Sequence, residues 1–365
     1  MGTERSHIDR IEVAAYTIPT DRPEADGTLD WDKTTMVVVH ARADGCTGLG
    51  WTYAHAAAAT LIEDTLSGVV RGGDALDVPA QWQRMNRQIR NAGRPGVGLM
   101  AIAAVDTALW DLKARLLGVP LTGLLGHARD KVPVYGSGGF TSYTLDELAA
   151  QLAGWVAQGI GRVKMKVGTH PEEDSRRVRT AREAIGEEAV LMVDGNGAYR
   201  REQALALAQA FAAQRVAWFE EPLSSDDLAG LHMVRERAPA GMAVAAGEYG
   251  WDAEYFRKML CAQAVDVLQA DATRCGGFTG FLQVDALCRG FNVPLSAHCA
   301  PALHLQVCSA AQSVVHLEYF HDHARIEHMA FEGVPDPVDG ALAADPSRPG
   351  MGYTLRASEI SRYRI

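Results

Sequence analysis

Eight short apolar segments alternate strictly with longer helical segments in the part of the chain that begins at Lys131. The helical segments, such as LDELAAQLAGWVAQG and REQALALAQAFAAQ, carry apolar residues at helical spacing. The apolar segments have the character of buried strands: VPVYGSGG, RVKMKVG, AVLMVDGNG, VAWFEEP, AVAAGEYG, VDVLQADATRCGG, VPLSAHC and VVHLEYF. Eight consecutive βα units predict a closed (β/α)₈ barrel of the TIM type.

An open doubly wound sheet is the alternative fold for this alternation. Such a sheet would normally carry a glycine-rich phosphate-binding turn after its first strand, and GSGGF is a poor version of that turn. We therefore favour the barrel.

The N-terminal part of the chain has a different pattern. Between Ile8 and about Ala54, apolar and polar positions alternate around turn-rich stretches, which indicates a meander of antiparallel strands. From Ala56 to Leu117 the apolar spacing becomes helical, and Gly118-Val119-Pro120 ends it. We expect an α/β protein with an N-terminal α+β domain over residues 1–125 and a modified (β/α)₈ barrel over 126–330, with a tail over 331–365 that packs back on the first domain.

Charge and composition limit the classes of partner. The net charge of -10 arises from 45 acids against 35 bases, and no Lys/Arg tract occurs, which argues against nucleic acid and anionic membranes. The segment MGTERSHIDR lacks the apolar core of a signal peptide, and the six cysteines form no CxxC pair. We expect a cytoplasmic protein with reduced thiols and a small-molecule partner.

Seven ionisable residues stand at the ends of apolar runs, 20 to 28 residues apart. A barrel places the carboxyl ends of all its strands at one rim, where active sites are built. The pattern therefore predicts one site made of Lys166, Asp194, Glu220, Glu248, Asp271, His298 and Glu318.

Two of the six lysines in the chain lie at the end of the second strand-like segment. Strand alternation places Lys164 and Lys166 on one face, where two close ammonium groups should lower each other's pKa. One of them can then act as a base near neutral pH. The alternative is a pair of solvated surface lysines.

Three carboxylates end the next three segments. Asp194, Glu220 and Glu248 would lie side by side on the rim and repel one another unless a cation lies between them. An all-carboxylate set with open positions suits Mg²⁺ better than Zn²⁺. The alternative is three rim acids that pair with arginines.

Asp271 and His298 end adjacent segments, so the carboxylate can accept a hydrogen bond from the imidazole and prepare it for proton transfer. Such a pair can also be merely structural. Glu318 would be a hydrogen-bond donor to an oxyanion if burial keeps it protonated. Together these groups describe α-proton abstraction from a carboxylate substrate, with Lys166 or His298 as the base and an enediolate as the product of that step.

The motifs KMK at 164–166, VDGN at 193–196, WFEEP at 218–222, AAGE at 245–248, QADATRCGG at 269–277 and SAHC at 296–299 resemble the enolase superfamily, mandelate racemase subgroup. The resemblance implies that the N-terminal domain caps the barrel and that the protein is a homo-oligomer, either a dimer or an octamer. It implies Mg²⁺ ligands at Asp194, Glu220 and Glu248, acid/base roles for Lys166 and the His298-Asp271 dyad, and supporting roles for Lys164, Asn196 and Glu318. Arg274 stands where a second lysine base would be needed, which disfavours the lysine-lysine branch.

Substrate choice in such families lies in capping-domain loops, here expected at Thr17–Trp31 and Gly50–His55. Their polar character suits a hydroxyl-rich substrate. The candidate substrate-binding residues are Asn196, Arg22, His55, Tyr135 and Ser137. We expect a dehydratase of an aldonate or aldarate; the alternatives are a racemase or epimerase of a 2-hydroxy acid and, more remotely, a binding protein without catalysis.

Overall fold

A closed barrel of eight parallel strands forms the larger part of the molecule. The computed structural model describes residues 6–365. The strands are arranged in chain order, and the last pairs with the first, which closes the barrel. The predicted barrel is confirmed. Its strands are β4 (Val132–Gly138), β5 (Arg162–Lys166), β6 (Val190–Asp194), β7 (Val216–Glu220), β8 (Ala243–Ala246), β9 (Val267–Ala270), β10 (Leu295–Ala297) and β11 (Val314–Phe320).

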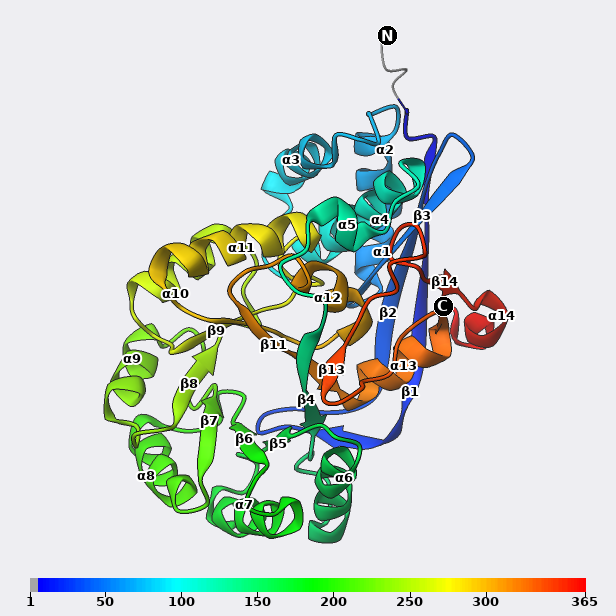
Figure 1. The fold of residues 1–365 in the computed structure, drawn as a ribbon. Helices are drawn as coiled ribbons and strands as arrows, with labels where there is room; N and C mark the ends of the chain where they lie inside the picture. The colour runs from blue at the N-terminus through cyan, green and yellow to red at the C-terminus, as the bar shows by residue number, and fades with distance from the viewer. Residues whose placement is uncertain (1–5) are drawn as a thin grey trace.

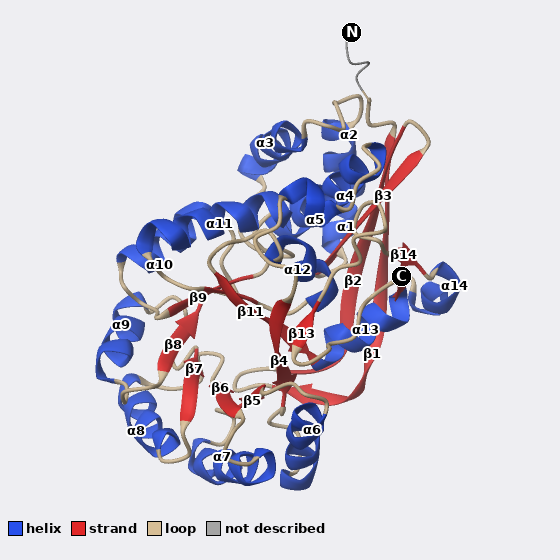
Figure 2. Ribbon diagram, viewed as in Figure 1, coloured by secondary structure: helices blue, strands red, loops and turns tan. Residues whose placement is uncertain are grey.

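A helix comes after each barrel strand and covers its outer face (Figures 1 and 2). The first helix begins at a capping box, in which Thr144 accepts from the Glu147 backbone and Glu147 bonds back to Thr144. Its Trp155 lies against β4 so closely that a Cβ at Gly136 would lie 2.4 Å from the indole ring. The helices are α6 (Leu145–Ala157), α7 (Pro171–Ile185), α8 (Arg201–Ala212), α9 (Leu228–Arg237), α10 (Ala253–Cys261), α11 (Gly277–Phe291), α12 (Pro301–Cys308) and α13 (His321–Ala330).

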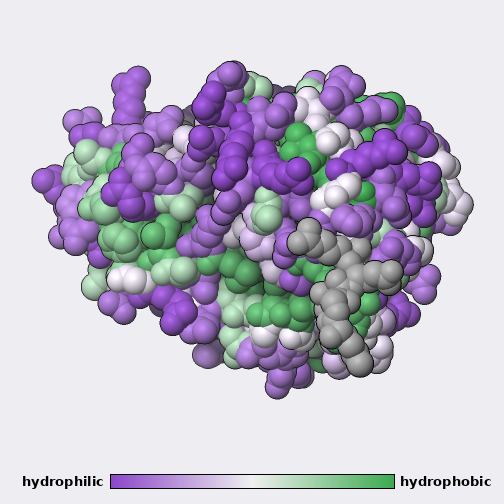
Figure 3. Space-filling model, turned by 90° about the horizontal axis from the view of Figure 1, so that it is seen from above, coloured by the Kyte–Doolittle hydropathy of each residue, from purple (hydrophilic) through white to green (hydrophobic). Residues whose placement is uncertain are grey.

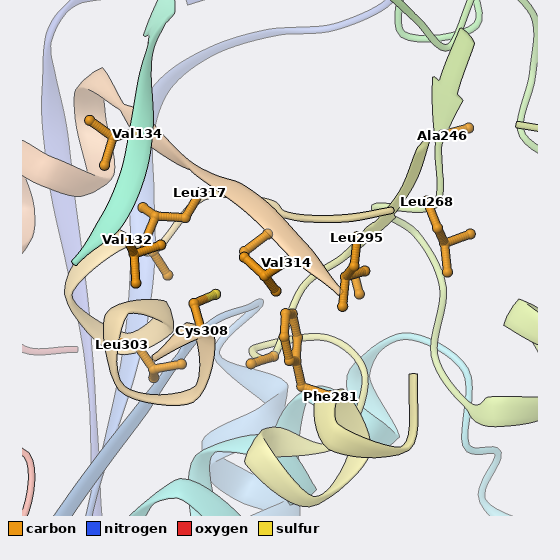
Figure 4. Packing of buried hydrophobic residues seen from close by; sticks show 14 of the residues in the cluster. Val132, Val134, Ala246, Leu268, Phe281, Leu295, Leu303, Cys308, Val314 and Leu317 are labelled. Carbon is orange, nitrogen blue, oxygen red and sulfur yellow. The ribbon is translucent and has the colours of Figure 1, made fainter. Parts of the chain in front are cut away.

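Apolar side chains of strands and helices pack into one continuous core between the two layers. Figure 4 shows Leu295 and Val314 from neighbouring strands near Phe281 of α11. All three are buried, and each full burial of such a side chain stabilises the fold by about 1.5–3 kcal/mol. The core holds the strands in place and therefore fixes the rim from which the ionisable residues project.

The N-terminal part forms a three-stranded antiparallel sheet covered by helices, as the predicted meander requires. Helix α4 lies so close to β3 that a Cβ at Gly50 would lie 2.4 Å from the Ala104 carbonyl oxygen. The elements are β1 (Arg10–Ala25), β2 (Asp30–Ala43), β3 (Cys46–Tyr53), α1 (Ala57–Leu61), η1 (Ile62–Leu66), α2 (Ser67–Val70), α3 (Val78–Gln88), η2 (Ile89–Asn91), α4 (Val97–Leu116) and α5 (Leu121–Leu125).

The segment expected as a loop over Thr17–Trp31 is mostly strand. Strands β1 and β2 remain paired as far as Ala25 and Asp30, with an irregularity between Pro19 and Glu24, so the turn itself is short. The segment Gly50–His55 is likewise largely strand, because β3 extends to Tyr53. Both predictions of loop structure are wrong because cross-strand pairing outweighs the turn-forming composition of these segments.

The tip of the β1–β2 hairpin rests on the mouth of the barrel (Figure 1). Thr169 donates its hydroxyl to the Asp26 carbonyl at 2.6 Å, and the Thr141 amide donates to the Ala25 carbonyl at 2.8 Å. A Cβ at Gly27 would lie 2.5 Å from the Gly195 carbonyl oxygen, so only glycine fits this contact. The hairpin therefore covers the rim beside β5 and β6.

The C-terminal tail contacts both parts of the molecule. It contains β12 (Phe331–Glu332), β13 (Ala341–Leu342), β14 (Thr354–Leu355), α14 (Ala357–Ile360) and η3 (Ser361–Tyr363). Strand β13 pairs antiparallel with β4, while Arg364 bridges to Tyr16 of β1. The tail thus lies against the barrel as well as the first domain. The domain limits 1–125 and 126–330 stay predictions.

The molecular surface is mostly hydrophilic on the face shown in Figure 3, with apolar residues gathered in patches. Within residues 6–365, no helix is both long and apolar enough to cross a membrane. The prediction that MGTERSHIDR is not a signal peptide concerns in part residues 1–5, which lie outside the described residues. All six cysteines are free thiols; four of them are buried, Cys46 is partly buried and Cys261 is exposed. A cytoplasmic location stays a prediction.

Candidate active site

Three buried carboxylates meet at the centre of the barrel mouth. Asp194 and Glu220 are the last residues of β6 and β7, and Glu248 stands two residues beyond β8. One oxygen from each lies within 4.8 Å of the others. All three side chains are almost fully shielded from solvent. Such a concentration of negative charge is costly unless cations lie close by.

The two lysines of β5 supply part of this compensation. The Lys164 ammonium lies 2.5 Å from Glu220 Oε1 and 2.9 Å from Glu318 Oε1. The Lys166 ammonium lies 2.5 Å from Asp194 Oδ2. Burial disfavours both charged forms, but the neighbouring carboxylates outweigh it and hold the pKa of each lysine above its usual range. The charge of Lys164 does lower the pKa of Lys166, as expected, but the carboxylates outweigh this effect, so the pKa of Lys166 lies above its usual range instead of near neutrality.

His298 lies on the other side of the three carboxylates. Its Nδ1 is 2.9 Å from Asp271 Oδ2, and its Nε2 is 3.3 Å from Glu248 Oε2. Burial opposes ionisation of Asp271, but the hydrogen bond and charge of His298 outweigh it and hold the pKa of Asp271 below its usual range. Because an ionised carboxylate only accepts, Nδ1 carries a proton and Nε2 is directed toward the mouth.

Glu318 takes a different protonation state from the one expected. Burial favours its neutral form, but Lys164 and His298 outweigh burial and hold the pKa of Glu318 well below its usual range. Its Oε2 also accepts the Cys299 backbone amide at 2.9 Å. Glu318 is therefore an ionised acceptor, and the expectation of a protonated donor is wrong.

The carboxylate group fits a hard divalent cation. Glu248 Oε2 is buried and has no hydrogen-bond partner among the described residues, and both carboxylate oxygens of the adjacent Glu221 are in the same state. Of the three central carboxylates, only Glu248 pairs with an arginine within residues 6–365, at 3.2 Å from Arg274 Nη1. Arginine pairing therefore does not account for the group, whereas an oxygen-only donor set suits Mg²⁺.

A cleft of about 470 Å³ separates the barrel mouth from the capping elements. Lys166, Glu248 and His298 line its barrel side. Of the five candidate substrate-binding residues, His55 and Asn196 line the cleft. The volume is typical of a small-molecule site.

The other three candidates lie elsewhere. Arg22 is exposed and forms an ion pair with Glu147 of α6. Tyr135 is fully buried below the rim, with its ring 5.2 Å from the Lys164 ammonium, and Ser137 is fully buried on the same strand. None of the three is among the residues that line the cleft, so the geometry does not support substrate contact by them.

Several cleft residues were not named individually from the sequence, although Trp31 and Tyr53 fall within the two segments expected to set substrate choice. Trp31, Lys33 and Thr35 of β2 all line the cleft, as do Tyr53 of β3 and His323 of α13. The first three occupy alternate positions, but Thr34 between them also lines the cleft, so alternation along β2 would have identified only part of this set. Tyr53 and His323 stack at a centroid distance of 3.5 Å, a contact between distant segments that no local pattern predicts.

Comparison with known proteins gives two family matches that cover most of the chain. Residues 11–126 match the mandelate racemase / muconate lactonizing enzyme N-terminal domain, and residues 147–359 match the enolase C-terminal domain-like model. A 3,6-anhydro-alpha-L-galactonate cycloisomerase from Streptomyces coelicolor is 34% identical, over 98% of this chain and 99% of its own length. An L-talarate/galactarate dehydratase from Salmonella typhimurium is 31% identical, over 95% and 89%.

Solved structures show the same relationship. A mandelate racemase/muconate lactonizing enzyme-like protein from Rubrobacter xylanophilus is 56% identical, covers 98% of this chain and 100% of its own, and superposes with a TM-score of 0.97. The Salmonella dehydratase, liganded with Mg and L-lyxarohydroxamate, gives a TM-score of 0.90 at 28% identity, over 99% and 93% of the two chains. The chain therefore belongs to the mandelate racemase/muconate lactonizing enzyme family of the enolase superfamily.

Proposed function

We propose that the protein is a Mg²⁺-dependent dehydratase of an acid sugar, which removes the α-proton of an aldonate or aldarate, eliminates the β-hydroxyl and yields a 2-keto-3-deoxy acid. The observation that carries the proposal is the placement of two proton-transfer groups on opposite sides of the carboxylate group. Lys166 contacts it at Asp194 and His298 contacts it at Glu248. A substrate bound there has one such group near each face.

Asp194, Glu220 and Glu248 are the residues that would hold Mg²⁺. When bound, the cation would neutralise the substrate carboxylate and so acidify the neighbouring C–H bond. The donor set supports this assignment, as do the magnesium-containing structures of relatives.

Lys166 and His298 each carry out one of the two proton transfers. One of Lys166 and His298 takes the α-proton in its neutral form, and the other, protonated, gives a proton to the departing β-hydroxyl, so that water leaves and no net proton is lost. Asp271 keeps His298 in the tautomer whose Nε2 is directed toward the cleft. Lys164 holds Glu220 and Glu318 in place below the reacting centre.

A racemase or epimerase is the second candidate, because the same two groups also permit removal and return of one proton on opposite faces of a single carbon. The cycloisomerase relative adds a related outcome. If the leaving β-oxygen belongs to a ring of the substrate, it stays tethered after elimination and the product is an isomer. The alternatives thus share the first proton abstraction and differ in the later steps. Cytoplasmic location and the dimer or octamer state remain predictions.

Incubation with a library of aldonates and aldarates separates these outcomes. We expect a semicarbazide-reactive 2-keto acid that has lost one water by mass spectrometry, and we expect Lys166→Ala and His298→Asn to abolish its formation. The control is Lys131→Met, since Lys131 is an exposed residue that immediately precedes β4, at the end of the strand opposite the rim. Deuterium exchange or inverted configuration without a keto acid would replace the dehydratase by a racemase, and wild-type behaviour of both variants would indicate a protein without this catalysis.

A further inference from the structure

Lys33 is a cation of the cleft that no described residue neutralises. It is an exposed residue of β2, and Trp31, Thr34 and Thr35 of the same strand line the cleft with it. Among residues 6–365, no carboxylate lies within ion-pair distance of its ammonium. Two further cations of the cleft are paired, Lys166 with Asp194 at 2.5 Å and Arg274 with Glu248 at 3.2 Å.

Two histidines add hydrogen-bond donors to the lining. The Nδ1 of His55 accepts the Ala57 backbone amide at 3.1 Å, so its Nε2 must carry the ring proton. The Nδ1 of His323 accepts the Ala300 amide at 3.2 Å, and burial lowers the pKa of His323 to about 3, which keeps the ring neutral with its proton on Nε2. Both rings therefore offer a donor nitrogen.

The acidic residue that the capping side contributes to the cleft lining does not neutralise Lys33. Asp26 also lines the cleft, but its Oδ1 already accepts the backbone amides of Thr28 and Leu29, at 2.6 and 2.8 Å. It closes the hairpin turn. The cleft lining thus contains Lys33 and the rings of His55 and His323 in addition to Glu248 and the other residues of the barrel side.

We propose that the substrate is a sugar diacid and that Lys33 binds its second carboxylate, assisted by His55 and His323. The assignment rests on the proposed function, in which the first carboxylate lies at Asp194, Glu220 and Glu248. An aldonate would present a neutral CH₂OH group to Lys33 and leave the ammonium without a counter-charge. A diacid supplies a counter-charge to Lys33 in addition to its first carboxylate, and the cleft volume of about 470 Å³ admits a six-carbon chain.

The test compares six-carbon sugar diacids with the aldonic acids that differ from them only in a terminal CH₂OH group. We expect the wild type to prefer the diacids in kcat/KM. Lys33→Met should lower kcat/KM for the diacids by about 10- to 100-fold, mainly through KM, because a charge-assisted hydrogen bond is lost. The same variant should change the aldonate values by no more than a factor of about three.

Two controls make the result specific. Lys33→Arg keeps the charge and should retain most of the diacid activity, while Lys131→Met removes an exposed lysine at the far end of the barrel and should change nothing. Preference of the wild type for aldonates, or an equal loss on both classes in Lys33→Met, would overturn the assignment.

Solvent deuterium exchange at the α-carbon keeps the two proposals apart. If Lys166→Ala abolishes exchange while Lys33→Met leaves diacid kinetics unchanged, the diacid assignment fails and the proposed function stands. If exchange persists in both Lys166→Ala and His298→Asn, the proposed function fails whatever Lys33 does.

Discussion

Lys164 shows at the scale of one residue how the site is held together. A single buried ammonium has Glu220 Oε1 at 2.5 Å, Glu318 Oε1 at 2.9 Å and Asp194 Oδ2 at 3.7 Å. Its side chain is fully shielded from water. The net stabilisation that such a buried charge gives is small, because its attraction to the carboxylates is offset by the loss of water from all the charges. Removing it costs more, since the carboxylates then stay buried without a counter-charge.

We expect Lys164→Met to lower the free energy of unfolding of the metal-free protein by about 3–5 kcal/mol, because it leaves buried carboxylates unpaired. Urea denaturation in the presence of a chelator measures this. The exposed Lys131→Met is the matched control and should unfold like the wild type. A stability for Lys164→Met equal to that of the control would mean that water or rearrangement, and not Lys164, compensates the carboxylates.

The β1–β2 hairpin is the element that closes the cleft, and Glu24 is its most deeply buried acid. Trp31 donates its indole N–H to Glu24 Oε2 at 2.8 Å, while Oε1 has no partner among the described residues. Burial, reinforced by the negative charges of Asp322 and Asp21, raises the pKa of Glu24 to about 8 despite the nearby Arg325. At neutral pH the hairpin is therefore closed over a protonated carboxyl group.

This protonation gives the hairpin a pH dependence whose sign is set by linkage. The pKa of Glu24 is higher in the folded than in the unfolded state. The stabilisation that protonated Glu24 gives to the folded hairpin is therefore fully present below the unfolded pKa. It declines as the pH rises and levels off above about 8. We expect hydrogen exchange of the Asp26–Leu29 turn, corrected for intrinsic rates, to accelerate as the pH rises from about 4.5 to about 8 and to level off above that. Glu24→Gln should remove the slope, since the amide still accepts from Trp31; an unchanged slope would assign it to another group.

The elements also show what local pattern can predict. Lys166, Asp194 and His298 stand at or just beyond the ends of barrel strands, so strand periodicity was enough to place them at one rim. The protonation of Glu318 and the two lysines depended on three-dimensional pairing, which spacing does not contain. Tyr135 and Ser137 looked equivalent to rim residues in the sequence, but the closing pairs of β4 with β11 place them in the interior. The β2 residues line the cleft only because the capping domain contacts the barrel, and local sequence pattern does not contain that contact.

At the scale of the whole molecule, Asp111 connects the tail to the capping domain. Its buried carboxylate accepts the Leu49 amide of β3 at 2.7 Å, the Met351 amide of the tail at 2.6 Å and the Arg115 side chain at 2.7 Å. The tail also pairs with the barrel through β13. One side chain therefore belongs to a connection that runs from the capping sheet to the barrel.

We expect Asp111→Ala to lower the free energy of unfolding by at least about 3 kcal/mol, because it leaves two buried amides and a guanidinium without their acceptor. Scanning calorimetry should show a lower melting temperature. Removal of the exposed Asp130 by Asp130→Ala controls for loss of charge and should leave the transition in place. A change within about 0.5 kcal/mol for Asp111→Ala would show that the tail is held by its other contacts.

The shielding of Lys166 and His298, each only 5% exposed, has a stereochemical consequence. In the proposed elimination, the enol that remains after water departs must gain a proton at C3 to become the keto acid. Bulk solvent can approach that carbon from either side, whereas a group fixed in the closed cleft reaches only one. The product of a reaction in heavy water would then carry its deuterium in a single configuration, so that the depth of two side chains in a barrel determines the handedness of a carbon atom.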